Sequence, residues 1–252
     1  DFSKGVLTEE ILWYFGRITA PELSPDGKTL LYSIKYFDYT KNKGNADLYT
    51  IPVEGGEPTQ ITQTAESEVN AVWCPDGKKI AFLYPAENDV MQIWTCNLDG
   101  SDRKQITHAE SDINGFVYSA DGKNLIYTRN VRLEPTIADR YPDLPEANAK
   151  IYDDLMYRHW DAWADGTYAH LFIAPVENPD ETVELLKDEK FHSPVPSGGG
   201  MEEVATSCDG KKLAYCCKRE TGKDFAVSTN TDIFIYDLET KETINLSEDN
   251  QG

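Results

Sequence analysis

Positively charged residues are scarce in this chain of 252 residues. Lysine and arginine together number 24, against 44 aspartate and glutamate residues, which gives a formal net charge of −20 at pH 7. A nucleic acid or an anionic membrane surface would be repelled by such a protein. The composition therefore argues against both as partners, and a well-solvated surface is the simplest interpretation of the acidity.

Long apolar runs are also missing. No stretch of the sequence approaches the roughly 20 apolar residues that a membrane-spanning helix requires. We therefore expect no insertion into a membrane. The chain begins at Asp1 rather than at methionine, so the sequence is compatible with the earlier removal of a signal peptide.

Cysteine is sparse and unevenly spaced, which argues against a disulfide framework and against a zinc site. An odd count leaves at least one free thiol, and no two-cysteine pairs stand at zinc-ribbon spacing. Neighbouring residues of a strand point to opposite faces, so the adjacent pair makes poor joint metal ligands. We predict no metal and no cofactor. The five cysteines are Cys74, Cys96, Cys208, Cys216 and Cys217.

The nucleophile elbow of serine hydrolases is absent as well. The pattern G-x-S-x-G occurs nowhere in the chain, and none of the four histidines has a recognisable triad context. We therefore predict no catalytic residue in these 252 positions.

The chain repeats one short phrase four times. Residues 24–33 read SPDGKTLLYS, residues 74–83 CPDGKKIAFL, residues 119–128 SADGKNLIYT and residues 207–216 SCDGKKLAYC. Asp-Gly between apolar runs predicts a tight turn between two strands, because glycine tolerates positive φ and the aspartate carboxylate can bond nearby backbone N–H groups. We interpret the turn residues as structural: Asp26, Gly27, Asp76, Gly77, Asp121, Gly122, Asp209 and Gly210.

Each repeat continues into two further strands. The apolar segments DLYTIPV, QIWTCNL, HLFIAPV and DIFIYDL follow the four turns, and each is followed by a polar turn and a short fourth strand. A lone sheet of this kind cannot bury two apolar faces, whereas radial stacking covers both. The pattern predicts an all-β fold, a β-propeller of four-stranded antiparallel blades.

The spacing of the repeats locates an insertion. The turn aspartates stand at 26, 76, 121 and 209, so the steps are 50, 45 and 88 residues, and the first two match one blade. The third step is nearly double because residues 129–168 intervene between the second and third strands. The predicted boundaries are a helix at 7–15, blade 1 at 22–62, blade 2 at 69–107, blade 3 at 113–186 with its insertion, and blade 4 at 201–247.

Two stretches of the chain resemble a known family. They are the opening, LTEEILWYFGRITAPELSPDGKTLLYS, and the end of the insertion, IYDDLMYRHWDAWADGTYAHLFIAPV. Both resemble the propeller of the prolyl oligopeptidase family of serine peptidases, in particular its bacterial dipeptidyl-peptidase and acylaminoacyl-peptidase members. Tol-system propellers carry similar DGK repeats.

The resemblance implies an incomplete seven-bladed propeller whose catalytic α/β-hydrolase domain, with its Ser-Asp-His triad, lies outside this chain. The implied function is a substrate-gating segment of a serine exopeptidase that releases dipeptides or acylated residues from short peptides. The implied partner is the protein's own C-terminal hydrolase domain, and the implied location is extracytoplasmic, with the cytoplasm left open. The alternatives are a non-catalytic, Tol-like propeller that binds proteins, and a complete four-bladed domain.

The insertion supplies the candidate substrate-facing or domain-interface residues. It is dense in aromatic and charged side chains, which indicates packing or recognition rather than disorder. The alternative is that the tryptophans only pack against blade 3 while Arg158 pairs with Asp153 or Asp154. The candidates are Arg158, His159, Trp160, Asp161 and Trp163.

Two weaker candidates complete the analysis. His159 and Asp161 lack a third ligand, so we interpret the histidine as a surface residue. Glu202 and Glu203 could bind a substrate amine, although their position before a strand favours a structural role. If blades 1 and 4 each expose an apolar face, we expect the chain on its own to self-associate.

Overall fold

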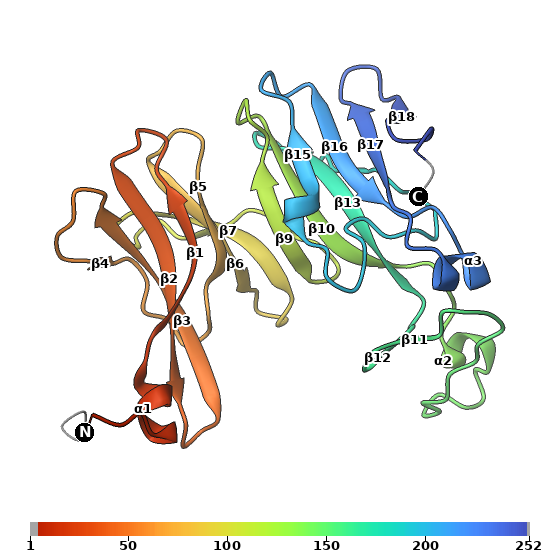
Figure 1. Cartoon of the computed structure of the whole chain (residues 1–252), viewed down its shortest axis with the longest axis horizontal. Coiled ribbons are helices and arrows are strands. Elements are labelled where there is room, and N and C mark those ends of the chain that lie inside the picture. The colour runs from red at the N-terminus through yellow and green to blue at the C-terminus, as the bar shows by residue number, and fades with distance from the viewer. Residues whose placement is uncertain (1–4, 251–252) are drawn as a thin grey trace. The chain divides into compact units, whose positions relative to one another are not determined.

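The computed structural model describes residues 5–250, which divide at residue 110 into two compact units. Each unit holds two four-stranded antiparallel sheets, and each sheet is formed by one continuous stretch of the chain (Figure 1). One sheet forms around each Asp-Gly turn. The all-β prediction, with propeller blades and a short helix at the start, is confirmed.

The first unit contains a short helix and blades 1 and 2. In each blade the four strands pair in chain order. The elements are α1 (Glu9–Tyr14), β1 (Arg17–Leu23), β2 (Thr29–Asp38), β3 (Lys43–Pro52) and β4 (Thr59–Gln60), then β5 (Val69–Trp73), β6 (Lys79–Pro85), β7 (Met91–Asn97) and β8 (Lys104–Gln105).

Helix α1 is shorter than the predicted 7–15, and the first strand starts earlier than the predicted residue 22. The Thr8 hydroxyl accepts a hydrogen bond from the Ile11 N–H at 3.3 Å, which caps the helix start. Strand β1 begins at residue 17 but shifts register between Thr19 and Glu22, where Ala20 has a positive φ. This bulge breaks the alternation by which a strand is recognised, so the sequence pattern hid its first half.

The core of the first unit lies between its two sheets. Alternate residues of the central strands of both blades meet there, as radial stacking of two-faced sheets requires. The buried cluster consists of Leu31, Leu48, Ile61, Ala71, Trp73, Ile80, Phe82 and Cys96.

The second unit contains blades 3 and 4 and the insertion. Its sheets pair in the orders β14-β13-β10-β9 and β15-β16-β17-β18. The elements are β9 (Ile113–Tyr118), β10 (Asn124–Arg132), α2 (Ile137–Arg140), β11 (Arg158–His159), β12 (Ala162–Trp163), β13 (Thr167–Pro175) and β14 (Val183–Glu184), then the 3₁₀ turn η2 (Met201–Glu203), β15 (Val204–Thr206), β16 (Lys212–Cys217), α3 (Gly222–Val227), β17 (Asp232–Asp237) and β18 (Thr243–Asn245).

The insertion is shorter than the predicted 129–168. Strands β10 and β13 remain paired out to Arg132 and Thr167, so only residues 133–166 leave the sheet. The sequence pattern at this end of β10 is typical of a loop, because three of its residues are polar. These residues, Arg129, Asn130 and Arg132, nevertheless pair with β13.

The core of the second unit again lies between two sheets. Strands β10 and β13 of blade 3 face strands β15, β16 and β17 of blade 4 across a layer of buried, mainly apolar side chains. Its buried members are Ile126, Leu171, Ile173, Leu186, Val204, Leu213, Tyr215, Cys217, Phe234 and Tyr236. Each of these two cores therefore forms between repeats rather than within one.

Candidate functional site

Hydrogen bonds hold the two ends of the insertion together where it leaves blade 3; we call this region, residues 132–134 and 165–166, the neck. The Arg132 guanidinium donates to the carbonyl oxygen of Asp165 at 2.7 Å, and the Leu133 N–H donates to the carbonyl oxygen of Gly166 at 3.0 Å. Gly166 has a φ of +80°, and a β-carbon there would approach Glu134 too closely. Glycine is therefore required where the two arms of the insertion converge.

Glu134 ties the neck to the linker between blades 3 and 4. Its carboxylate accepts hydrogen bonds from the Lys190 ammonium and the Tyr168 hydroxyl, each at 3.0 Å. The Lys190 contact lowers the pKa of Glu134. Burial, reinforced by the neighbouring carboxylate, raises the pKa of Tyr168 to about 12, so the phenol stays protonated and keeps donating.

Helix α2 fixes the first arm of the insertion. The Thr136 hydroxyl accepts from the Asp139 N–H, and the Asp139 carboxylate accepts from the Thr136 N–H at 2.7 Å. This reciprocal pair is a capping box, and the Thr136 hydroxyl lowers the pKa of Asp139. One turn of helix is thereby stabilised without burying a side chain.

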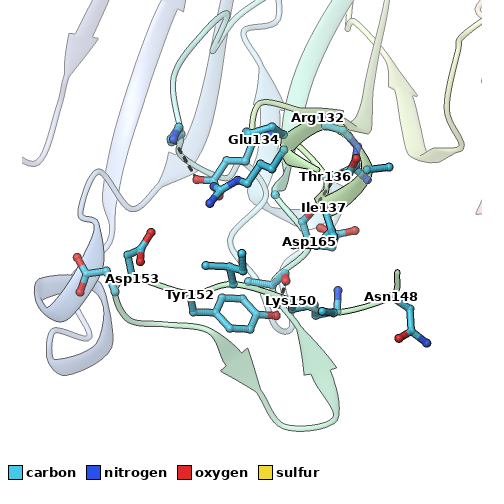
Figure 2. Close-up of a pocket in the computed structure, with 18 of the residues that line it drawn as sticks. Arg132, Glu134, Thr136, Ile137, Asn148, Lys150, Tyr152, Asp153 and Asp165 are labelled. Carbon is cyan, nitrogen blue, oxygen red and sulfur yellow. Dashed lines mark hydrogen bonds and ion pairs between the residues drawn. The ribbon is translucent and has the colours of Figure 1, made fainter. Parts of the chain in front are cut away.

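The arms of the insertion, together with Arg132, Tyr168 and Lys190, line an open cavity of about 850 Å³. Figure 2 shows Arg132, Glu134 and Asp165 on one wall and Lys150 and Tyr152 on the other. The volume is in the range of small-molecule and peptide-side-chain pockets. Charges of both signs line it, so the cavity suits polar groups rather than an apolar ligand.

The end of the insertion is a two-stranded hairpin, in which β11 and β12 pair Arg158 with Trp163. The Arg158 guanidinium lies 5.2 Å from the centre of the Trp163 ring and donates to the carbonyl oxygen of Trp160 at 2.8 Å, rather than pairing with an aspartate. Trp163 stacks with Tyr152 and Tyr157. Trp160 is 81% exposed, so the alternative in which it packs against blade 3 is wrong.

The hairpin and Glu203, which were predicted separately, both contact the segment of residues 195–197. The His159 imidazole lies 3.3 Å from the Ser197 hydroxyl, on the segment that leads into η2. The Glu203 carboxylate accepts from the Val195 N–H at 2.9 Å and so supports that segment, whereas Glu202 is exposed. This geometry supports the structural interpretation of Glu203 and leaves Glu202 without an assigned role.

The described residues, 5–250, contain no group of three or more potential metal ligands. His159 and Asp161 thus gain no third ligand there. Within the same range no helix is long and apolar enough to cross a membrane.

Residues 8–152 match the family model of the TolB β-propeller domain. The match covers more than half of the chain. The chain belongs to the TolB β-propeller family.

Two curated relatives match this TolB-type propeller over almost its whole length. Dipeptidyl-peptidase 5 of Porphyromonas endodontalis is 36% identical over 249 residues, and that of Porphyromonas gingivalis is 37% identical over 248 residues. Each alignment covers 98% of this chain but 36% of the relative. The chain thus spans about a third of the length of these proteins, and it is a propeller segment related to dipeptidyl peptidases.

Solved structures confirm the fold. An acylaminoacyl peptidase in complex with Z-Gly-Gly-Phe-chloromethyl ketone superposes with a TM-score of 0.66 at 18% identity, covering 95% of this chain and 33% of that one. At this identity the similarity shows the fold of the propeller alone.

Three of the four Asp-Gly turns of the propeller share one hydrogen-bond pattern. Asp26, Asp121 and Asp209 each accept from the serine hydroxyl two residues earlier and from the N–H two residues later. The serine hydroxyl lowers the pKa of each. In the remaining turn Cys74 stands in place of the serine, and Asp76 accepts from the Lys78 N–H. The glycines have φ between 66° and 71°.

A second recurring motif escaped the sequence analysis. Thr62 and Thr107 end the two QIT segments, and their hydroxyls accept from the N–H groups of Leu48 and Ile93, each at 2.9 Å. Thr62 also donates to the fully buried carboxylate of Glu68. The repeated QIT was the available signal, since a threonine at the same place in two blades indicates a shared backbone bond.

Proposed function

We propose that this chain is the substrate-gating propeller segment of a serine exopeptidase that releases dipeptides or acylated residues from peptide N-termini. The observation that carries the proposal is the identity of 36% and 37% to two dipeptidyl-peptidase 5 proteins across 98% of the chain. Acyl transfer is assigned to an α/β-hydrolase domain of the whole protein, because these 252 residues contain no nucleophile elbow.

The proposed contribution of the propeller is steric and electrostatic. Loops at one end of the blades would limit entry to short peptides, and the acidic surface would favour substrates with a free amine over acidic ones. The insertion, residues 133–166, is the part proposed to border the substrate chamber, because it leaves the sheet and carries exposed aromatic side chains.

The test is peptidase activity of the uninterrupted gene product. We expect it to release a chromogenic amine from dipeptidyl or acylaminoacyl substrates and to be blocked by a serine-directed phosphonate. A polypeptide of residues 1–252 assayed beside it is expected to be inert. A full product that cleaves no member of the panel would overturn the proposal.

A protein-binding role is the second candidate, because the matching family model is that of the TolB propeller. In that case the full gene product would cleave nothing and would instead form a stable complex with a protein partner. The same substrate panel, followed by affinity isolation of the intact protein, distinguishes the two functions.

A further inference from the structure

The tip of the insertion carries an exposed surface that is both aromatic and acidic. We define this hairpin surface by six residues. Tyr157 and Trp163 are 44% and 48% exposed, and Trp160 at the turn is 81% exposed. The surface consists of Tyr152, Asp153, Tyr157, Trp160, Asp161 and Trp163.

Trp160 occupies a position that folding alone does not explain. Trp160 and Asp161 are the two residues of the tight turn between β11 and β12, and Trp160 has a φ of 51°. Glycine is favoured where a two-residue hairpin needs a positive φ, and a bulky side chain there is strained. A tryptophan that is strained and almost fully exposed gains little from burial, so its benefit to the protein comes from contact with something else.

Hydrogen bonds and ring contacts within the hairpin support the backbone of the turn that carries Trp160. The Arg158 guanidinium donates to the Trp160 carbonyl oxygen and lies over the Trp163 ring, while the rings of Trp163, Tyr152 and Tyr157 form a mutually contacting cluster with centres about 6 Å apart. The Tyr152 hydroxyl donates to the Ala164 carbonyl oxygen at 2.7 Å. A rigid aromatic side chain at a fixed position binds at low entropic cost.

The insertion that carries the hairpin surface has a net negative charge. Residues 133–166 contain eight acidic and three basic residues, a net charge of 3 − 8 = −5. The Asp153 and Asp161 side chains are exposed and make no hydrogen bond or ion pair with any other described residue. Arg158, the basic residue of the hairpin, is already engaged by Trp160 and Trp163.

We propose that the hairpin surface docks a lysine- or arginine-containing segment of a polypeptide. A cationic side chain would stack on the Trp160 ring and pair with the Asp161 carboxylate, while Asp153 attracts a second cation. The complementarity of charge selects this partner, since an acidic peptide would be repelled and a neutral one would gain only the aromatic contact. The inference concerns a binding surface and does not depend on the peptidase activity proposed above.

Binding to the intact protein tests the proposal. Any serine nucleophile is first blocked with a phosphonate, so that an active site does not capture the probes. The probes are three labelled peptides of equal length, acetylated and amidated at their ends, rich in lysine, glutamine or glutamate. Fluorescence anisotropy is expected to show the lysine peptide binding about tenfold or more tighter than the glutamine peptide, and more weakly as salt is raised.

Variants at the surface separate binding from folding. Trp160→Gly suits the positive φ, so the variant is expected to melt no lower than wild type while binding the lysine peptide about tenfold more weakly. Asp161→Asn is expected to weaken binding about threefold and to reduce the salt dependence. The charge-matched control is Glu181→Gln, an exposed acid between β13 and β14, and it should bind as wild type does.

Three results would overturn the inference. They are equal binding of the three peptides, a Trp160→Gly protein that binds the lysine peptide as wild type does, and an equal loss in the control variant. The last would show that the lysine peptide responds to the net charge of the protein rather than to the hairpin surface.

Discussion

Two histidines near the root of the insertion, one fully buried and one partly buried, have different hydrogen-bond partners. The fully buried His170 ring lies 2.6 Å from the Glu184 carboxylate through Nδ1 and 3.0 Å from the Glu189 carbonyl oxygen through Nε2. His192 instead accepts from the Ala169 N–H at 3.1 Å through Nδ1 and must be neutral there. Burial, and then the charge of His170, lower the pKa of His192 to about 4.

This difference predicts acid sensitivity. The pKa of His192 is lower in the folded protein than the unfolded value of about 6.5, so its contribution to stability is complete above that pH and is lost as the pH falls toward 4. We expect the free energy of unfolding to fall by roughly 3 kcal/mol at most between pH 6.5 and pH 4. In His192→Asn the amide oxygen can still accept from Ala169 but cannot titrate, so chemical denaturation should show a shallower decline. An identical decline in both proteins would contradict this assignment.

At the scale of the element, buried polar groups stabilise the linker between blades 1 and 2, residues 61–68. The Glu68 carboxylate is fully buried and accepts from Thr62, Thr64 and the Arg103 guanidinium, the last at 2.9 Å. Arg103 also lies 3.9 Å from the centre of the Tyr84 ring. The linker is thus fixed by a buried polar network beside an apolar core, in which the Arg103 Nη2 atom has no hydrogen-bond partner among the described residues.

Removing one member of this network is predicted to be costly. Glu68→Ala leaves the Arg103 guanidinium partly buried without its carboxylate, and we expect a loss of about 3 kcal/mol in the free energy of unfolding. The matched control is Glu66→Ala, two residues away, which breaks an exposed ion pair with Lys43 and should cost about 0.5 kcal/mol. Urea denaturation of the two variants measures the difference, and equal losses would refute the buried role of Glu68.

At the scale of the whole molecule, the outer face of blade 4 is apolar and accessible. The inner residues of β16 and β17 pack against blade 3, and alternation turns their neighbours outward. Cys216 pairs across the ladder with Ile233, and Ile235 with Ile244, so the outer face is a continuous apolar strip. Ile233 and Ile244 are 43% and 58% exposed.

We predict that a polypeptide of residues 1–252 on its own self-associates through such faces, because apolar strips of this kind favour burial. Ile233→Lys combined with Ile244→Lys should shift sedimentation at micromolar concentration toward the monomer. The control is Lys211→Glu with Lys241→Glu, which changes charge near the same blade without touching the strip. A wild-type chain that sediments as a clean monomer would disprove the prediction.

The sequence by itself determined the blades of this protein. Asp-Gly turns, strand alternation and their spacing are local signals, because glycine and aspartate favour the turn wherever they occur, and so the four sheets and helix α1 could be predicted. The bulge at Ala20 and the polar end of β10 were hidden, since in both places the pairing partner, rather than the local pattern, maintains the strand.

Only the tertiary structure decided what surrounds the insertion. The sequence singled out His159, but its contact with Ser197 joins residues that lie 38 positions apart in the chain. Likewise, no local pattern indicates that Glu68 is buried or that His192 must stay neutral. Burial and hydrogen bonding are set by contacts between blades, and these form only when the repeats stack.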